Sequence, residues 1–142
     1  MATQTPPRWD LTNVYPSLSS KEFAADTDKL TRLITEMEAF LREKAVAMSG
    51  TEEIHQLTSL ALTLVDSFNE LLLTTGTLGA YIHSFIATDS YNKEALRKES
   101  EFDQVAVKIE QLQVLVLTWI GKVAGRLPEM FKAEPKLEAH RY

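Results

Sequence analysis

Cysteine is absent from the 142-residue sequence, which excludes disulfide bonds and thiolate metal sites. Basic residues are also in the minority: 15 Lys and Arg stand against 20 Asp and Glu, giving a net charge of -5. Nucleic-acid binding needs a basic face, so this balance disfavours nucleic acid as a partner. The sequence start has no charged segment followed by an apolar run, so we expect no signal peptide.

Uninterrupted apolar runs long enough to cross a membrane are missing too, and we therefore expect no membrane partner. The remaining composition, 44% hydrophobic and 25% charged, is typical of one globular domain. Together these features predict a cytoplasmic protein.

The first helix is predicted from a start signal and an apolar stripe. Ser19 and Glu22 have the spacing of a capping box, in which each side chain accepts a hydrogen bond from an otherwise free backbone N–H. Apolar residues then recur at steps of three and four. We expect this helix to run to about Met48 and to stop at Gly50, because glycine tolerates the positive φ of a helix end.

The second helix has the clearest periodicity in the sequence. Thr51 is the predicted cap, and apolar residues alternate steps of three and four from Ile54 to Phe85 without a break in phase. This predicts one helix from about Glu52 to Ala87, with the two glycines of "TTGTLG" as the place for a bend. The alternative is two helices joined at "TTGTLG".

A third helix is predicted to start at the cap Asn92 and to carry an apolar stripe from Leu96 to Val123. Pro128 and Pro135 each suit the first turn of a short further helix. The last helical pattern has no stop signal before Tyr142. The expected fold is all-α, an antiparallel bundle of three long helices plus short carboxy-terminal helical segments.

The segment "RWDLTNVYPS" precedes these helices and is too short and broken to be one. Its apolar side chains need cover from the rest of the molecule. We therefore expect residues 1–18 to be an extended anchoring segment, with Trp9, Leu11 and Tyr15 as structural anchors, and residues 19–142 to form the helical lobe.

Two stretches, "SLALTLV" and "VLVLTWI", are apolar on nearly every face of a helix. Three helices cannot cover such stretches completely. Either a fourth element of this chain packs there, or another domain or chain does. A coiled-coil dimer seam is the functional alternative to a simple core.

The sequence contains no pattern typical of catalysis. A zinc protease of the common type needs H-E-x-x-H, and none of His55, His83 and His140 is followed by Glu. His55 is expected at the surface and His83 half-buried beside the apolar register. Gly-rich phosphate loops are missing as well. We predict no catalytic residue and no metal ligand, and the sequence indicates no particular substrate-binding residue.

The order of motifs resembles the amino-terminal region of oligoendopeptidase F, of the thimet-oligopeptidase-like zinc metallopeptidases. The resemblance covers nearly the whole chain. It is carried by two motifs of the sequence and the long helices between them: Trp9, Asp10, Leu11 and Tyr15, then Tyr81, Asp89, Ser90 and Asn92.

This resemblance implies a lobe that acts as a lid, restricting the channel of a two-lobed enzyme to short peptide substrates. Zinc and its H-E-x-x-H ligands would belong to the catalytic lobe of the same polypeptide, and none of those residues is found here. The chain would then be a fragment, which the helical ending favours, or a stand-alone relative without activity. The alternative function is a non-enzymatic helical interaction module that forms a homo-oligomer through its surplus apolar faces.

Overall fold

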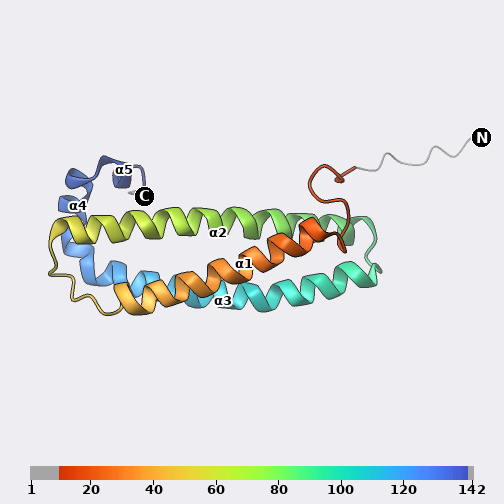
Figure 1. Ribbon diagram of the computed structural model, residues 1–142, viewed down its shortest axis with the longest axis horizontal. Helices are drawn as coiled ribbons and strands as arrows, with labels where there is room; N and C mark the ends of the chain where they lie inside the picture. Colours follow the sequence, from red (N-terminus) through yellow and green to blue (C-terminus); the bar gives the residue numbers. More distant parts are fainter. Residues whose placement is uncertain (1–9, 141–142) are drawn as a thin grey trace, which may run out of the picture.

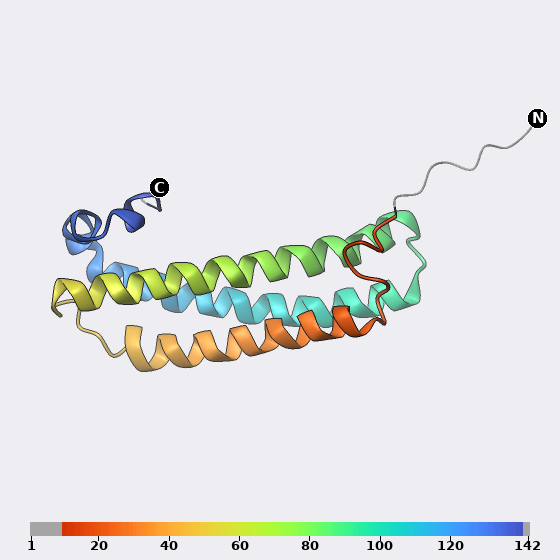
Figure 2. The same ribbon diagram turned by 45° about the horizontal axis from the view of Figure 1, so that its top comes forward.

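Three long helices side by side make up most of this protein (Figures 1 and 2). A computed structural model describes residues 10–140, in which the elements are α1 (Lys21–Phe40), a π-helical turn (Leu41–Ala45), α2 (Ile54–Thr88), α3 (Lys93–Val123), a 3-10 turn (Ala124–Arg126), α4 (Leu127–Ala133) and α5 (Pro135–Glu138). Helix α2 runs opposite to α1 and α3, so the predicted all-α antiparallel bundle with short carboxy-terminal helices is confirmed.

Helix α1 begins one residue later than the predicted capping box requires. The cap is Ser20, whose hydroxyl accepts a hydrogen bond from the backbone N–H of Phe23 at 3.2 Å. The hydroxyl of Ser19 instead pairs with that of Ser17. The prediction of Ser19 as the cap was therefore wrong, because the side chain contacts its neighbour in the preceding turn.

The end of α1 also differs from the prediction. The helix widens into the π-turn, where the N–H of Val46 donates to Leu41, and it stops there instead of reaching Met48. The ammonium group of Lys122 on α3 donates hydrogen bonds to the carbonyl oxygens of Val46 and Met48, at 2.6 and 3.0 Å. These tertiary hydrogen bonds satisfy carbonyl groups that a longer helix would have used.

Gly50 lies in the loop between α1 and α2 and has a φ of 89°, as the prediction of positive φ requires. It is not directly at the helix end, however. A β-carbon placed on Gly50 would lie 2.6 Å from the backbone oxygen of Lys122. Glycine is therefore needed both for the conformation and for the close approach of α3.

Helix α2 starts at Ile54, so the predicted cap Thr51 was wrong. The Thr51 hydroxyl contacts that of Ser49, and the residue at the cap position, Glu53, makes no side-chain capping hydrogen bond. Downstream, α2 is one continuous helix through Gly76 and Gly79, which excludes the two-helix alternative.

Helix α3 begins at the predicted cap, where the Asn92 side chain accepts from the N–H of Ala95 at 3.0 Å. Pro128 and Pro135 lie in the first turns of α4 and α5, as predicted. Helix α5 ends at Glu138, so the expectation that the helical pattern continues to the last residue is wrong for residues 139 and 140.

The core follows the inner faces of the three long helices and extends under the short ones. Met130 of α4 and Leu137 of α5 are buried where these helices pack on α2. Figure 1 shows helices α4 and α5 beside the first turns of α2. The short helices thus supply part of the fourth covering element that the broad apolar stretches require.

Candidate functional site

The predicted anchors lie in the segment that precedes α1. Tyr15 is buried, Leu11 packs at the edge of the core, and Trp9 lies outside the described residues. Figure 2 shows this segment passing over the last turns of α2. Leu18, which the sequence analysis did not name, is buried with Tyr15.

Tyr15 is held by a cluster of aromatic rings. Its ring makes edge contacts with Phe23 and Tyr81, with centroids 5.4 and 5.0 Å apart, and Tyr81 contacts Phe85 in the same way. The Tyr15 hydroxyl donates to the carboxylate of Asp26. Burial and this hydrogen bond raise the pKa of Tyr15, so the phenol stays protonated and remains a donor.

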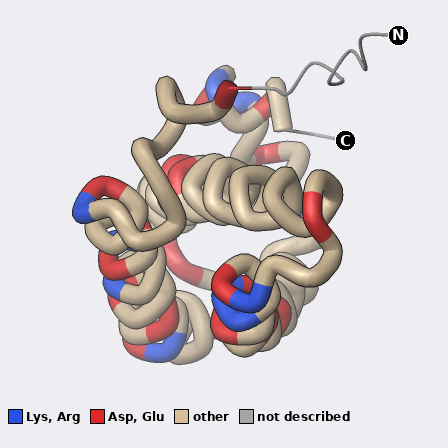
Figure 3. Tube along the Cα trace, turned by 90° about the vertical axis from the view of Figure 1, so that its right-hand side faces the viewer, with Lys and Arg blue, Asp and Glu red and all other residues tan. Residues whose placement is uncertain are grey.

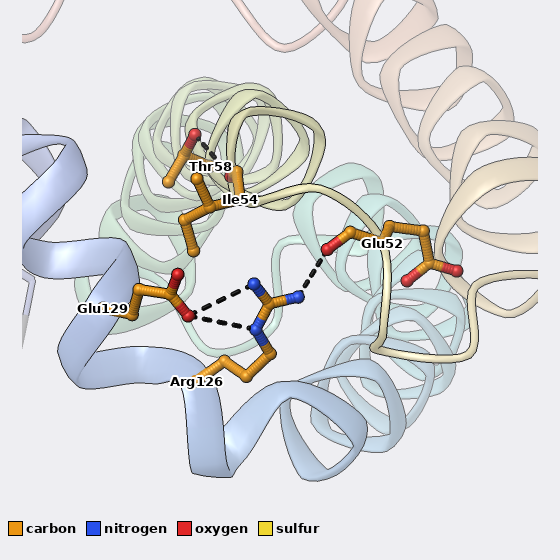
Figure 4. Close-up of polar contacts among 5 residues, drawn as sticks. All are labelled: Glu52, Ile54, Thr58, Arg126 and Glu129. Atoms are coloured by element: carbon orange, nitrogen blue, oxygen red, sulfur yellow. Dashed lines mark hydrogen bonds and ion pairs between the residues drawn. The ribbon is translucent and has the colours of Figure 1, made fainter.

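At the opposite end of the bundle, a polar clamp joins the loop before α2 to the segment after α3 (Figure 4). The Arg126 guanidinium donates to the backbone oxygen of Glu52 and pairs with the Glu129 carboxylate at 3.2 Å. The Glu52 carboxylate accepts from the backbone N–H groups of Ser49 and Gly50, at 2.8 and 2.9 Å.

The backbone hydrogen bond from Ser49 is the main reason that the pKa of Glu52 falls to about 2. This carboxylate, predicted as a first-turn helix residue, thus closes a loop instead. The hydrogen bonds of Glu52 and Arg126 tie this loop to the segment after α3, and we interpret the clamp as structural.

The three histidines lie apart from any cluster of metal ligands. His55 and His140 are exposed. His83 is also exposed, where the sequence analysis expected it half-buried, because it points from α2 toward Glu99 of α3, 3.9 Å away. Within residues 10–140, no group of three or more His, Asp or Glu side chains is arranged to hold a metal ion.

The most unusual surface feature is an outer stripe of large apolar side chains on α3. We define this outer stripe as Leu96, Val107, Val114 and Leu117. Their steps of eleven, seven and three residues place them along one side of the helix, where the exposed acids Asp103 and Glu110 lie between them. All four apolar side chains are exposed, Leu117 by 65%. Single exposed apolar residues are common, but Val114 and Leu117 lie one turn apart, and we interpret the stripe as a candidate contact surface.

Helix α2 adds to this apolar exposure. Its 35 residues include the acids Asp66 and Glu70 but neither Lys nor Arg, and Leu72 and Leu73 are exposed. In Figure 3, which views the bundle end-on, charged positions are frequent along α1 and α3. By length and composition alone α2 could cross a membrane, which is weak evidence because the core helix of a soluble protein passes the same test.

Comparison with protein-family models, curated proteins and solved structures gives no match for this chain. The resemblance to oligoendopeptidase F therefore stays a prediction. What the geometry adds is the location of the surplus apolar surface. The sequence indicated "VLVLTWI" as too apolar for three helices, and the structure places Val114 and Leu117 of that stretch outside the core.

The clamp was missed by the sequence analysis. The sequence analysis named neither Lys122 nor Arg126, because nothing in their spacing indicated a partner more than seventy residues away.

Proposed function

We propose that this chain is a docking lobe, which packs its outer stripe against a larger protein body. By the resemblance stated above, that body is the catalytic lobe of a zinc-dependent oligoendopeptidase that hydrolyses short peptides. The lobe would narrow access to the channel and thereby select short substrates. By the same resemblance, zinc would be held by residues of the catalytic lobe.

The outer stripe is the observation that supports this proposal. Covering an exposed Val or Leu stabilises a contact by about 1 kcal/mol per side chain at these exposures. The four side chains are exposed in the lobe alone, so a partner that covers them would gain this hydrophobic free energy on binding. Catalytic chemistry has no comparable support among the described residues.

The first test is the coding sequence beyond Tyr142. The proposal requires an open reading frame that continues and encodes H-E-x-x-H within a few hundred residues. A stop codon immediately after Tyr142 would contradict it and favour the non-enzymatic module.

The second test is biochemical and uses the purified 142-residue chain. We expect no zinc at stoichiometric level and no cleavage of fluorogenic peptides. Stoichiometric zinc together with turnover would show that the lobe itself is the enzyme, and would contradict the proposal.

The self-associating module is the second candidate, because the same outer stripe could pair with a second copy. Sedimentation equilibrium over a hundredfold range of concentration measures this. A tight homodimer that Leu117→Ser disrupts, in a gene that stops at Tyr142, would establish the module in place of the lobe.

A further inference from the structure

A second surface lies at the end of the bundle opposite the clamp, between the segment before α1 and the last turns of α2. It is an open groove of about 1350 Å³. Six residues between Asp10 and Ser17 line one side, seven between Thr77 and Thr88 line the other, and Asp89 and Asn92 of the turn after α2 complete it. This volume exceeds the 300–1,000 Å³ typical of small-molecule pockets and suits a peptide segment.

The lining of the groove is mostly apolar, and its charged residues are all acidic. Leu11, Val14, Pro16 and Phe85 supply apolar surface. Among the fifteen described residues that line the groove, the charged ones are Asp10 and Asp89, and neither Lys nor Arg is present. The groove therefore offers a negative potential with no compensating positive charge in its lining.

The carboxylates are held in place by their own turns. Asp10 accepts from the N–H and hydroxyl of Thr12, at 3.0 and 2.7 Å, and Asp89 accepts from the N–H of Tyr91 at 3.0 Å. The hydrogen bonds from Thr12 also lower the pKa of Asp10 below its ordinary value.

An exposed aromatic ring accompanies the acids. Tyr91 lies in the turn between Asp89 and Asn92 and is 88% exposed, the highest value among the large apolar side chains described. Tyrosine is enriched at binding hot spots, and an aromatic face beside a carboxylate favours a guanidinium group. Tyr91 itself does not line the groove, but its turn borders the groove through Asp89 and Asn92.

We propose that this groove binds a peptide segment of a partner protein that carries apolar residues and arginine. The apolar side chains lie against Val14 and Phe85, and the arginine pairs with Asp89. This inference does not rest on the proposed function, because the groove and the outer stripe are separate surfaces.

The probe is an amidated ten-residue peptide with several leucines followed by two arginines. Two controls keep its length: one replaces the arginines by glutamates, the other replaces the leucines by serines. Nitrogen-15 NMR spectra of the 142-residue chain report where each peptide binds. We expect shifts confined to residues 10–17 and 77–92 with the leucine–arginine peptide, and none with either control.

Matched variants then test the two parts of the groove. Asp89→Asn keeps the acceptor for Tyr91 but removes the charge, and should weaken binding about fivefold. Asp103→Asn, an exposed acid on α3 outside the groove, should leave binding unchanged. Val14→Ser should weaken binding, whereas Val46→Ser, of equal exposure (41 and 40%), should not.

Three results would overturn the inference. The first is binding that the glutamate control reproduces. The second is a set of shifts on the outer stripe of α3 in place of the groove. The third is a peptide that binds only after residues 1–9 are deleted, because the groove would then belong to the start of this chain. Circular dichroism of each variant establishes that it is folded before its binding is compared.

Discussion

The phenol of Tyr81 donates a hydrogen bond to the backbone oxygen of Tyr15, 2.8 Å away and 66 residues earlier in the sequence. Both residues are buried, and their rings are in edge contact. This one relationship ties the segment before α1 to the third-last turn of α2. It explains why a short, non-helical stretch is part of the core.

Tyr81→Phe tests this tie. The substitution keeps the ring contacts but leaves the buried oxygen of Tyr15 without this donor, which costs about 1–2 kcal/mol. For a domain of this size we expect the melting temperature to fall by about 3–6 °C. Thermal unfolding followed by circular dichroism measures the change.

Tyr91→Phe is the matched control, because it removes the same hydroxyl from an exposed ring. Its melting temperature should equal that of the original protein. An equal loss in both variants would show that the Tyr81 hydrogen bond contributes nothing specific.

The glycines predict stability changes of opposite sign. Gly50→Ala places a β-carbon at positive φ and 2.6 Å from the Lys122 oxygen, so it should lower the free energy of unfolding by at least about 1–3 kcal/mol. Gly76→Ala has no neighbouring atom within 4 Å in a helix interior, and should raise that free energy by about 0.5–1 kcal/mol.

Urea denaturation of both variants measures these values. A stabilising Gly50→Ala would mean that the loop moves away from α3 in solution and that the clamp is not formed there.

The pKa of Glu52 predicts how the loop responds to acid. This pKa lies near 2 in the folded protein, below its ordinary value of 4.5, so the carboxylate stabilises the fold above about pH 4.5. The contribution is lost as the pH falls through about 2. Glu52→Gln should therefore be less stable than the original protein at pH 6, and the difference should shrink between pH 4.5 and 2.

Urea denaturation at several pH values tests this dependence. Hydrogen exchange of the Ser49 and Gly50 amides should be faster in Glu52→Gln at pH 6, because both donate to that carboxylate. A stability difference that stays constant down to pH 2 would exclude the ionised carboxylate as its cause.

Local signals predicted the elements whose partners are local. Asn92 caps α3 by accepting a hydrogen bond from the backbone N–H three residues later. The apolar periodicity that continues through Gly76 and Gly79 correctly indicated one helix. At Gly79 the reason for glycine is tertiary, since an added β-carbon would lie 3.1 Å from the ring of Phe102. The sequence showed that α2 is continuous but not what the glycine accommodates.

Sequence reasoning failed where a distant side chain competes for the backbone. The helix through α1 ends at Ala45, not at about Met48 as predicted, and α2 starts at Ile54, not at about Glu52. Lys122 and Arg126 lie more than seventy residues later in the sequence. They reach the loop between α1 and α2 only after the chain has formed α2 and α3, and they donate hydrogen bonds to its carbonyl groups. The sequence showed that the helices carry more apolar residues than three helices can cover. It did not show where the outer stripe lies, because periodicity does not reveal which helix faces remain exposed in the bundle.

Leu117 and Leu112 provide the final prediction, since one leucine of α3 is exposed and the other buried. Leu112→Ser removes a core side chain and buries a hydroxyl, so it should cost about 2–5 kcal/mol of unfolding free energy. Leu117→Ser should change that free energy by less than about 0.5 kcal/mol, because the side chain has little to lose in the isolated lobe.

The same Leu117→Ser variant should weaken any contact made by the outer stripe, whether with a catalytic lobe or with a second copy. Urea denaturation measures stability, and sedimentation or binding measurements report the contact. If Leu117→Ser unfolded the lobe as readily as Leu112→Ser, the outer stripe would be part of the core. It would then offer no free surface for docking, and the proposed function would lose its support.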